Sequence, residues 1–408
     1  MNCRHCGAAL QHVFLDLGFA PPANNYLSRE DLSQPEVYLP LRLYVCEQCW
    51  LVQTEDYARP EKLFRADYAY FSSTSNSWLK HGERFSSMIC ERLSLGPDSF
   101  VIEVGCNDGY LLKNFVAFGI PCLGIEPSGG VAAAAKALGI PVLTDFFDEE
   151  LGKALADQKK LADLVIGNNV YAHVPDINSF TAGLKVALKP GGTITLEFPH
   201  LLKLVQGTQF DTVYHEHYSY LSLFSVQRVF SAFGLRVWDV EELDTHGGSL
   251  RVYGCHRDDT RIETPAVRKI LDDEIQAKMR DLATYDSFQS DAEKLKNNLL
   301  SFLIQAKKEG AKVAAYGAAA KGNTLLNYAG IKPDLLPYVC DAAPSKQGKF
   351  LPGSHVPIVA PDRLRDWTPD FVLILPWNLA DEIMAEASFI RSWSGKFITA
   401  IPELRVIS

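Results

Sequence analysis

Two cysteine pairs lie near the start of the 408-residue chain, and each has the spacing of a metal-binding turn. The first pair is Cys3 and Cys6, and the second pair is Cys46 and Cys49. A Cys-x-x-Cys turn offers two thiolates to one tetrahedral ion, so two such turns complete a four-sulfur shell. Because four protein ligands leave no open coordination position, the pattern predicts a structural zinc site. Four unrelated buried thiols are the alternative.

A glycine-containing turn follows a strand predicted at residues 100–104, and such a turn lets the backbone approach a ligand at a helix N-terminus. The next strand ends at Glu126, whose carboxylate can accept hydrogen bonds from both ribose hydroxyls of a nucleoside. After the third strand, Asp145 can accept a hydrogen bond from the adenine amino group, and Phe146 offers a flat ring beside the adenine. We therefore predict an adenosine site, at which either S-adenosylmethionine or NAD would fit, formed by Glu103, Gly105, Asn107, Gly109, Glu126, Asp145, Phe146 and Asn168.

Two segments dense in polar side chains follow the fourth and fifth predicted strands, at the sheet edge where ligands bind in such folds. Residues 168–175 include His173, and residues 211–220 include Tyr214, Glu216 and His217. The second segment has too many titratable and hydroxyl groups for a core segment. Some of its aromatic rings can serve packing, and we expect one of its histidines to be structural.

Alternating apolar runs and amphipathic stretches must position these residues, and this alternation indicates an α/β fold with a parallel sheet. The expected strands are 100–104, 122–125, 164–166 and 193–198, and the expected helices are 110–118, 131–138 and 179–188. A helix at 225–233 and strands at 235–240 and 249–255 follow. The short link through Gly247 and Gly248 predicts an antiparallel pair at the sheet edge, which is typical of class I methyltransferases and favours S-adenosylmethionine as the cofactor.

A charged helical stretch at 265–308 leads to a second series of strands at 312–316, 336–340, 371–375 and 396–401. The turn at 317–322 follows a strand and precedes a helix, as phosphate-binding turns do. It lacks the full G-x-G-x-x-G spacing, so we do not expect it to bind NAD independently.

The composition narrows the possible partners and location of the protein. A formal charge of −9 argues against a nucleic-acid partner, which would need a basic face. Apolar runs are too short for a membrane span, and the first residues lack a hydrophobic signal core. We therefore expect a cytoplasmic protein with reduced cysteines, no membrane association and a monomeric state.

The chain as a whole resembles the bacterial sugar C-methyltransferases that act on nucleotide-linked 4-keto-6-deoxyhexoses. An ordered set of motifs carries the resemblance over essentially the whole length. These are the two cysteine pairs and the segments 70–73, 103–109, 126–128, 168–175, 214–217, 245–248, 316–323 and 341–347.

The resemblance implies a small N-terminal zinc-binding domain (1–66), a central Rossmann-like class I methyltransferase domain (67–257) and a C-terminal Rossmann-like domain (258–408). The cofactors would be S-adenosylmethionine and structural zinc, and the substrate a keto sugar linked to dTDP or GDP. His217 would be the base that removes a proton beside the ketone, for which an imidazole is suited because its pKa lies near neutral pH.

Further site residues follow from the same resemblance. Glu216 would orient the base or bind the sugar, while Tyr70, His173 and Tyr214 would shape the pocket or stabilise the enolate. The expected substrate contacts are Ser73, His246, Arg251, Lys321, Asn323 and Lys346. For the lysines among them, an ordinary solvated surface position is the alternative.

The resemblance leaves the methylated position open, because C-3 and C-5 both flank a C-4 ketone. We favour C-3 and keep 5-C-methylation as the alternative. An NAD-dependent sugar-nucleotide oxidoreductase or epimerase, using one or both Rossmann-like halves, is an alternative of a different class. A non-catalytic zinc scaffold is the third, and the presence of Glu126, Glu216 and His217 argues against it.

Overall fold

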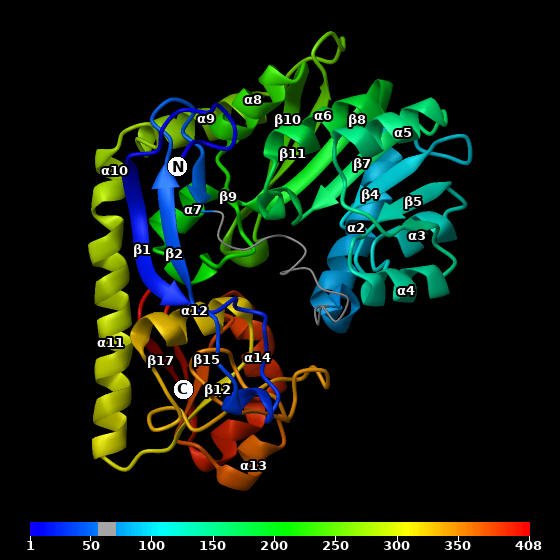
Figure 1. Cartoon of the computed structure of the whole chain (residues 1–408). Coiled ribbons are helices and arrows are strands. Elements are labelled where there is room, and N and C mark those ends of the chain that lie inside the picture. Colours follow the sequence, from blue (N-terminus) through cyan, green and yellow to red (C-terminus); the bar gives the residue numbers. More distant parts are fainter. Residues whose placement is uncertain (56–70) are drawn as a thin grey trace. The chain divides into compact units, whose positions relative to one another are not determined.

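The computed structural model describes residues 1–55 and 71–408 of the chain (Figure 1). The described residues divide into two compact units that are interleaved along the sequence. Unit 1 comprises Met1–Gln11, Val45–Leu201 and Tyr218–Arg280, and unit 2 comprises His12–Tyr44, Leu202–His217 and Asp281–Ser408. Among the described helices, none has both the length and the apolar character needed to cross a membrane.

Unit 1 is built on a mostly parallel sheet. Its strands are β4 (Val101–Val104), β5 (Cys122–Ile125), β6 (Val142–Leu143), β7 (Ala162–Asn168), β8 (Leu188–Pro199), β10 (Leu235–Leu243) and β11 (Ser249–His256). They lie in the order β10-β11-β8-β7-β4-β5-β6, and all pairs from β8 to β6 are parallel. The four strands predicted before residue 200 are thus confirmed, and so is the α/β class.

The last two strands of this sheet run antiparallel, as the short link between them predicts. Strand β11 pairs antiparallel with both β8 and β10, and β10 forms the edge. The pair turns between Leu243 and Ser249, which are register partners. This antiparallel edge pair was predicted from the sequence and is typical of class I methyltransferases.

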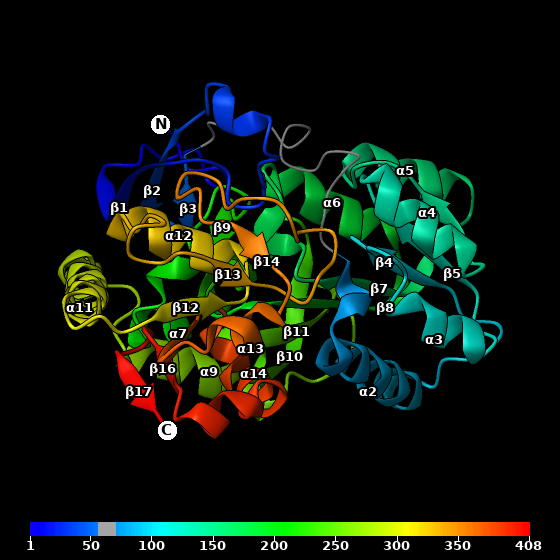
Figure 2. The same cartoon turned by 90° about the horizontal axis from the view of Figure 1, so that it is seen from below.

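Helices lie on both faces of the unit 1 sheet (Figure 2). They are α2 (Asn76–Leu93), α3 (Leu112–Ala117), α4 (Gly129–Ala137), α5 (Glu149–Asp157), α6 (Ile177–Ala187), α8 (Leu223–Ala232) and α9 (Pro265–Gln276). Helices α2, α3 and α4 bury Phe85, Phe115 and Ala135 in one apolar cluster with the strands. Rings from α6 and α8 pack elsewhere, where Tyr171 lies 5.7 Å from Phe180 and 6.3 Å from Phe230. Burial of these side chains on both faces holds the strand ends in place.

Unit 2 contains a second α/β sheet of the order β14-β13-β12-β15-β16-β17. Its strands are β12 (Val313–Tyr316), β13 (Val339–Cys340), β14 (Ile358–Val359), β15 (Phe371–Ile374), β16 (Lys396–Thr399) and β17 (Arg405–Ile407). The first five are parallel and β17 is antiparallel. The four predicted strands are confirmed, but β14 and β17 were missed because such short edge strands carry little periodic signal.

The predicted helical stretch at 265–308 is helical but changes unit along its length. Helix α9 belongs to unit 1, whereas α10 (Ala283–Asp286) and α11 (Phe288–Lys308) belong to unit 2. Strand β1 (His12–Ala20) lies beside α11 (Figure 1), where the ring of Phe14 is 5.1 Å from Tyr285 and 4.6 Å from Phe288. The three domains expected from the sequence, with boundaries after residues 66 and 257, remain a prediction.

The chain leaves unit 1 after β8 and returns to it at Tyr218. The excursion contains α7 (Leu201–Gln206), a 3-10 turn at Phe210–Thr212 and the polar residues 214–217. It returns as β9 (Ser219–Tyr220), which pairs with β3 (Val52–Thr54) in unit 1. The polar segment predicted to carry chemistry is therefore part of unit 2, together with α12 (Ala320–Ala329).

Candidate functional site

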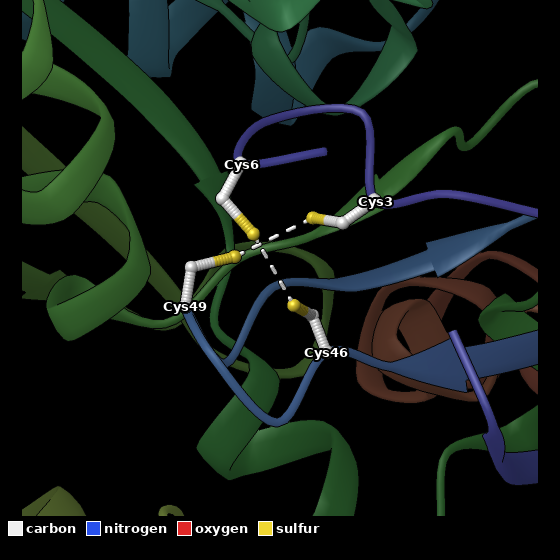
Figure 3. A group of neighbouring side chains, drawn as sticks. All are labelled: Cys3, Cys6, Cys46 and Cys49. Carbon is white, nitrogen blue, oxygen red and sulfur yellow. Dashed lines mark hydrogen bonds between the residues drawn. The ribbon is translucent and has the colours of Figure 1, made fainter. Parts of the chain in front are cut away.

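The four cysteines of the two pairs converge on one point in unit 1 (Figure 3). All four sulfurs lie within 4.8 Å of one another, with Cys3 to Cys49 at 3.4 Å and Cys6 to Cys46 at 3.5 Å. Four sulfurs around a tetrahedral zinc ion at about 2.3 Å stand about 3.8 Å apart, so the geometry suits this metal. The site predicted from the spacing is confirmed.

The surroundings of the cysteines also favour a bound dication. Burial raises the pKa of the Cys46 thiol to about 11, whereas the hydrogen bond with Cys49 lowers that of Cys3 to about 4, so one thiolate is already stabilised by its neighbours. The buried amide of Gln53 donates to the sulfur of Cys3 at 3.2 Å. Gly7 and Trp50, each the residue after a pair, both have positive φ, of 75° and 62°. The tryptophan thus adopts the backbone form that glycine adopts in the other turn, at a cost of about 1 kcal/mol.

The glycine turn at the carboxyl end of β4 is closely packed. Gly105 and Gly109 have φ of 69° and 79°, and Asn107, with φ of 49°, shares the left-handed form. A Cβ at Gly109 would lie 2.5 Å from Ile140 Cδ1, so a larger residue would have to displace this side chain as well as adopt a strained positive φ. The backbone N–H groups of Ser72 and Ser73 donate to Asn107 Oδ1 at 2.9 Å and Asp108 Oδ2 at 3.0 Å. The Ser72–Ser73 motif therefore docks on this turn.

The carboxylate of Glu126 lies at the end of β5, as predicted. It accepts hydrogen bonds from the backbone N–H of Asn107 at 3.1 Å and of Ser128 at 2.9 Å. The bond from Asn107 ties the end of β4 to the end of β5, and both bonds fix the carboxylate, which still has lone pairs for ribose hydroxyls.

Three carboxyl groups, those of Glu103, Asp108 and Glu126, belong to this turn and the strand ends beside it. Glu103 is only 1% exposed, and its pKa is raised well above the usual value by burial and by the charges of Glu126 and Asp108. Glu103 Oε2, Asp108 Oδ1 and both side-chain polar atoms of Asn168 are buried without a partner among the described residues. The oxygen acceptors among these atoms suit the ammonium and sulfonium of S-adenosylmethionine better than the pyrophosphate of NAD, which needs donors.

Four other residues that were predicted to bind ligands lie in unit 1, in the segments that follow its strands. Asp145 and Phe146 are exposed after β6, and Phe146 is 39% exposed. His173 ends a 3-10 turn after β7, and the ring of His246 lies 5.3 Å from that of Trp78. Their ligand roles stay predictions. Tyr70 lies outside the described residues.

Arg251 is held in a buried ion-pair network. Only 4% of it is exposed, and its terminal nitrogens contact Glu197 at 3.0 Å and Glu241 at 3.1 Å. Glu197 also contacts His81 at 2.9 Å, and its pKa is lowered because these partners outweigh burial. The network joins β8, β11 and α2, so Arg251 has a stabilising role beside the predicted phosphate contact, which remains a prediction.

In unit 2, the imidazole of His217 has a defined orientation. His217 is 7% exposed, and its Nδ1 lies 3.2 Å from the carbonyl oxygen of Thr212. A neutral imidazole that donates from Nδ1 carries its lone pair on Nε2 and can accept a proton there. The ring of Tyr214 lies 4.1 Å from it. By contrast, Nε2 of His215 lies 3.1 Å from the carbonyl of Pro40, a structural position.

Glu216 is buried beside an asparagine that sequence reasoning missed. Asn24 Nδ2 donates to Glu216 Oε2 at 2.6 Å, and Glu216 is 2% exposed. Burial raises the pKa of Glu216 to about 7, while the hydrogen bonds from Asn24 oppose that rise. Asn24 lies 192 positions away in the sequence, so only the fold could reveal this pair.

Around the turn after β12, Lys346 forms part of a polar cluster. Its Nζ donates to the Ala318 carbonyl at 2.9 Å and lies 3.3 Å from Asp341, and Tyr26 donates to the same carbonyl at 2.7 Å. Asn323 Oδ1 is buried without a partner among the described residues. Lys346 is thus half-buried and engaged, which differs from a solvated surface lysine.

A glycine turn with an acidic partner, a reversed edge pair and a four-cysteine site together define a zinc-containing class I methyltransferase. Three family models match the chain: "Putative zinc binding domain" at residues 3–64, "Methyltransferase domain" at 78–240 and "C-methyltransferase C-terminal domain" at 244–402. The C-methyltransferase NovU of Streptomyces niveus is 35% identical over 407 residues, which are 100% of this chain and 97% of that protein. The chain therefore belongs to the S-adenosylmethionine-dependent C-methyltransferases with a zinc-binding domain.

More distant relatives match shorter parts of the chain. A ubiquinone biosynthesis O-methyltransferase of Rhodopseudomonas palustris (strain BisB18) is 31% identical over 98 residues, which are 24% of this chain and 38% of that protein. The solved structure of magnesium protoporphyrin IX methyltransferase (ChlM) from Synechocystis PCC 6803 with bound SAM is 15% identical and covers 44% of this chain and 82% of that one, with a TM-score of 0.33.

The zinc site predicts a metal-free variant. Cys46→Ser removes one of four sulfurs, and we expect the zinc content to fall from one equivalent per chain to near zero, with a lower unfolding midpoint. Cys90→Ser, in α2 and outside the cluster, is the control and should keep its zinc. One equivalent of zinc retained by Cys46→Ser in metal analysis would contradict the assignment.

The raised pKa of Glu216 predicts a pH-dependent stability. Because the folded-state pKa is about 7 and the ordinary value is 4.5, the folded protein binds more protons between these values, and its stability falls as pH rises through that window. The full loss is about 3 kcal/mol. Glu216→Gln should remove this loss, so the difference in unfolding free energy between variant and wild type should grow from pH 4.5 to pH 8 in urea titrations. Parallel curves for the two proteins would refute the prediction.

Proposed function

We propose that this C-methyltransferase methylates a nucleotide-linked 4-keto-6-deoxy sugar, carried on dTDP or GDP, at C-3. The observation that carries the proposal is the hydrogen bond that holds His217 Nδ1 to a backbone carbonyl, which presents Nε2 as a base in a buried polar segment. Similarity to NovU over the full length supports transfer to carbon. The sugar substrate rests on the shared motifs.

The chemistry requires a base and a stabiliser of negative charge. A C–H bond beside a ketone is acidic because the electron pair left on carbon spreads onto the oxygen as an enolate. His217 Nε2 takes the proton, and the enolate carbon then forms the new C–C bond. When bound, S-adenosylmethionine supplies an electrophilic methyl group, whose C–S bond breaks with its electron pair going to sulfur.

The remaining residues assist these steps in our proposal. Glu216, which is buried and hydrogen-bonded to Asn24, orients the base or binds the sugar. Tyr70, His173 and Tyr214 shape the pocket or donate to the enolate oxygen. Glu103, Gly105, Asn107, Gly109, Glu126, Asp145, Phe146 and Asn168 hold the methyl donor, and Ser73, His246, Arg251, Asn323 and Lys346 bind the sugar nucleotide.

Two alternatives differ from this proposal in distinct ways. Methylation at C-5 uses the same enolate chemistry and the same base. An NAD-dependent oxidoreductase or epimerase requires a pyrophosphate at the glycine turn, where Glu103, Asp108 and Glu126 oppose it. The acidic turn therefore favours methyl transfer over hydride transfer.

The proposal predicts the effect of removing the base. His217→Asn keeps a polar side chain but loses the proton acceptor, so exchange of the sugar's C–H proton with D2O should slow by at least 100-fold, as seen by NMR on dTDP- or GDP-linked 4-keto-6-deoxy sugars. His215→Asn removes a neighbouring histidine that contacts backbone carbonyls and should keep its exchange rate in the folded fraction. Exchange at the wild-type rate in His217→Asn would exclude His217 as the base.

The methylated position can be read from the product. With a 13C-methyl donor, we expect one new methyl signal correlated with C-3 of the sugar. A signal correlated with C-5 would correct the position and leave the base assignment untouched.

A further inference from the structure

Helix α12 contacts the segment that leads to His217 through one face. Lys321, Thr324 and Tyr328 are spaced three and four residues apart, so they share this face. Thr324 Oγ1 donates to the carbonyl of Val213 at 2.8 Å, and the Tyr328 ring packs edge-on against Phe210 at 5.5 Å. The turn at 210–213 is thus held at both ends by α12.

Trp377 lies between the carboxylate of Asp211 and the ammonium of Lys321 and contacts both. The indole N–H of Trp377 donates to Asp211 Oδ2 at 2.8 Å, and Nζ of Lys321 lies 4.8 Å from the centre of the same ring. Lys321 Nζ also donates to Asn378 Oδ1 at 2.6 Å. A carboxylate on the N–H edge makes the indole more electron-rich, which strengthens its attraction for a cation on its face.

The charges in this cluster depend on one another. Asp211 is 0% exposed, and burial raises its pKa to about 6, while the charge of Lys321 opposes that rise. Burial lowers the pKa of Lys321, and the charge of Asp211 opposes that change in turn. Each residue therefore stabilises the charged form of the other, and losing either would leave a buried charge poorly compensated.

We propose that Lys321, acting through Trp377 and Asp211, is a positioning residue that fixes the turn at Phe210–Thr212 and thereby the orientation of His217. Asp211 is adjacent to Thr212, whose carbonyl holds His217 Nδ1. This inference rests on the proposed function, in which His217 is the base. It replaces a direct diphosphate contact for Lys321, because its ammonium already serves Asn378 and the indole face.

The two roles of Lys321 differ in their kinetic consequences. A positioning role predicts that Lys321→Met lowers kcat and the D2O exchange rate together, by about 10-fold to 100-fold, with KM for the sugar nucleotide changed less than about 2-fold. A diphosphate contact predicts the reverse, since removing uniform binding energy raises KM. If KM rose by 10-fold or more while kcat stayed unchanged, the proposal would be overturned.

Two further variants protect the test from a folding failure. Trp377→Phe removes the indole N–H together with the pyrrole part of the ring, keeps a benzene ring beside Lys321, and should lower kcat several-fold. Lys321→Arg keeps the cation and should restore most of kcat. Titration with S-adenosylhomocysteine counts the folded molecules, so that kcat is given per competent site. Unchanged kcat in Trp377→Phe would overturn the proposal.

A combined variant separates this inference from the proposed function. In a His217→Asn background, Lys321→Met should cause no further loss, because its effect passes through the missing imidazole. A full additional loss would overturn the positioning role. The exchange rate of His217→Asn alone, in contrast, tests the base assignment itself.

Discussion

The hydrogen bond between His217 and the Thr212 carbonyl is the interaction on which the proposed chemistry depends. An imidazole has two nitrogens, and only a fixed donor at one of them leaves the other as a dependable proton acceptor. A backbone carbonyl is a good partner for this purpose, since it cannot ionise or change rotamer. Its own position must then be secured, and the 3-10 turn at Phe210–Thr212 and helix α12 provide that support.

The pKa of Glu103 in unit 1 and the pKa of Glu216 in unit 2 are both raised. Burial is the main cause for Glu103, and the charges of Glu126 and Asp108 add to it. A cationic methyl donor beside these carboxyl groups would favour their ionised forms. For Glu216, desolvation is the main cause of the raised pKa. Its proton is therefore available near neutral pH for a neighbouring group.

Local sequence signals were sufficient for the parts of the structure that depend on local spacing. The cysteine pairs, the glycine turn, Glu126 and the edge pair β10 and β11 are each encoded within a few residues, and the structure confirms their geometry. Contacts between distant segments were not predictable. Asn24 reaches Glu216 and Trp377 reaches Asp211 across 192 and 166 positions, and no periodicity records such pairs. The interleaving of the two units escaped prediction for the same reason.

The four-cysteine site joins residues that are far apart in the chain, since Cys6 and Cys46 are separated by 40 positions. The stretch that it encloses, His12–Tyr44, belongs to unit 2, whereas the cysteines belong to unit 1. Closing a loop of this length by a crosslink removes about 4 kcal/mol of chain entropy from the unfolded state. Asn24 lies inside the loop, so the metal shortens the conformational search by which this asparagine reaches Glu216. A structural zinc ion thereby favours the Asn24–Glu216 hydrogen bond through the unfolded chain, without coordinating either residue.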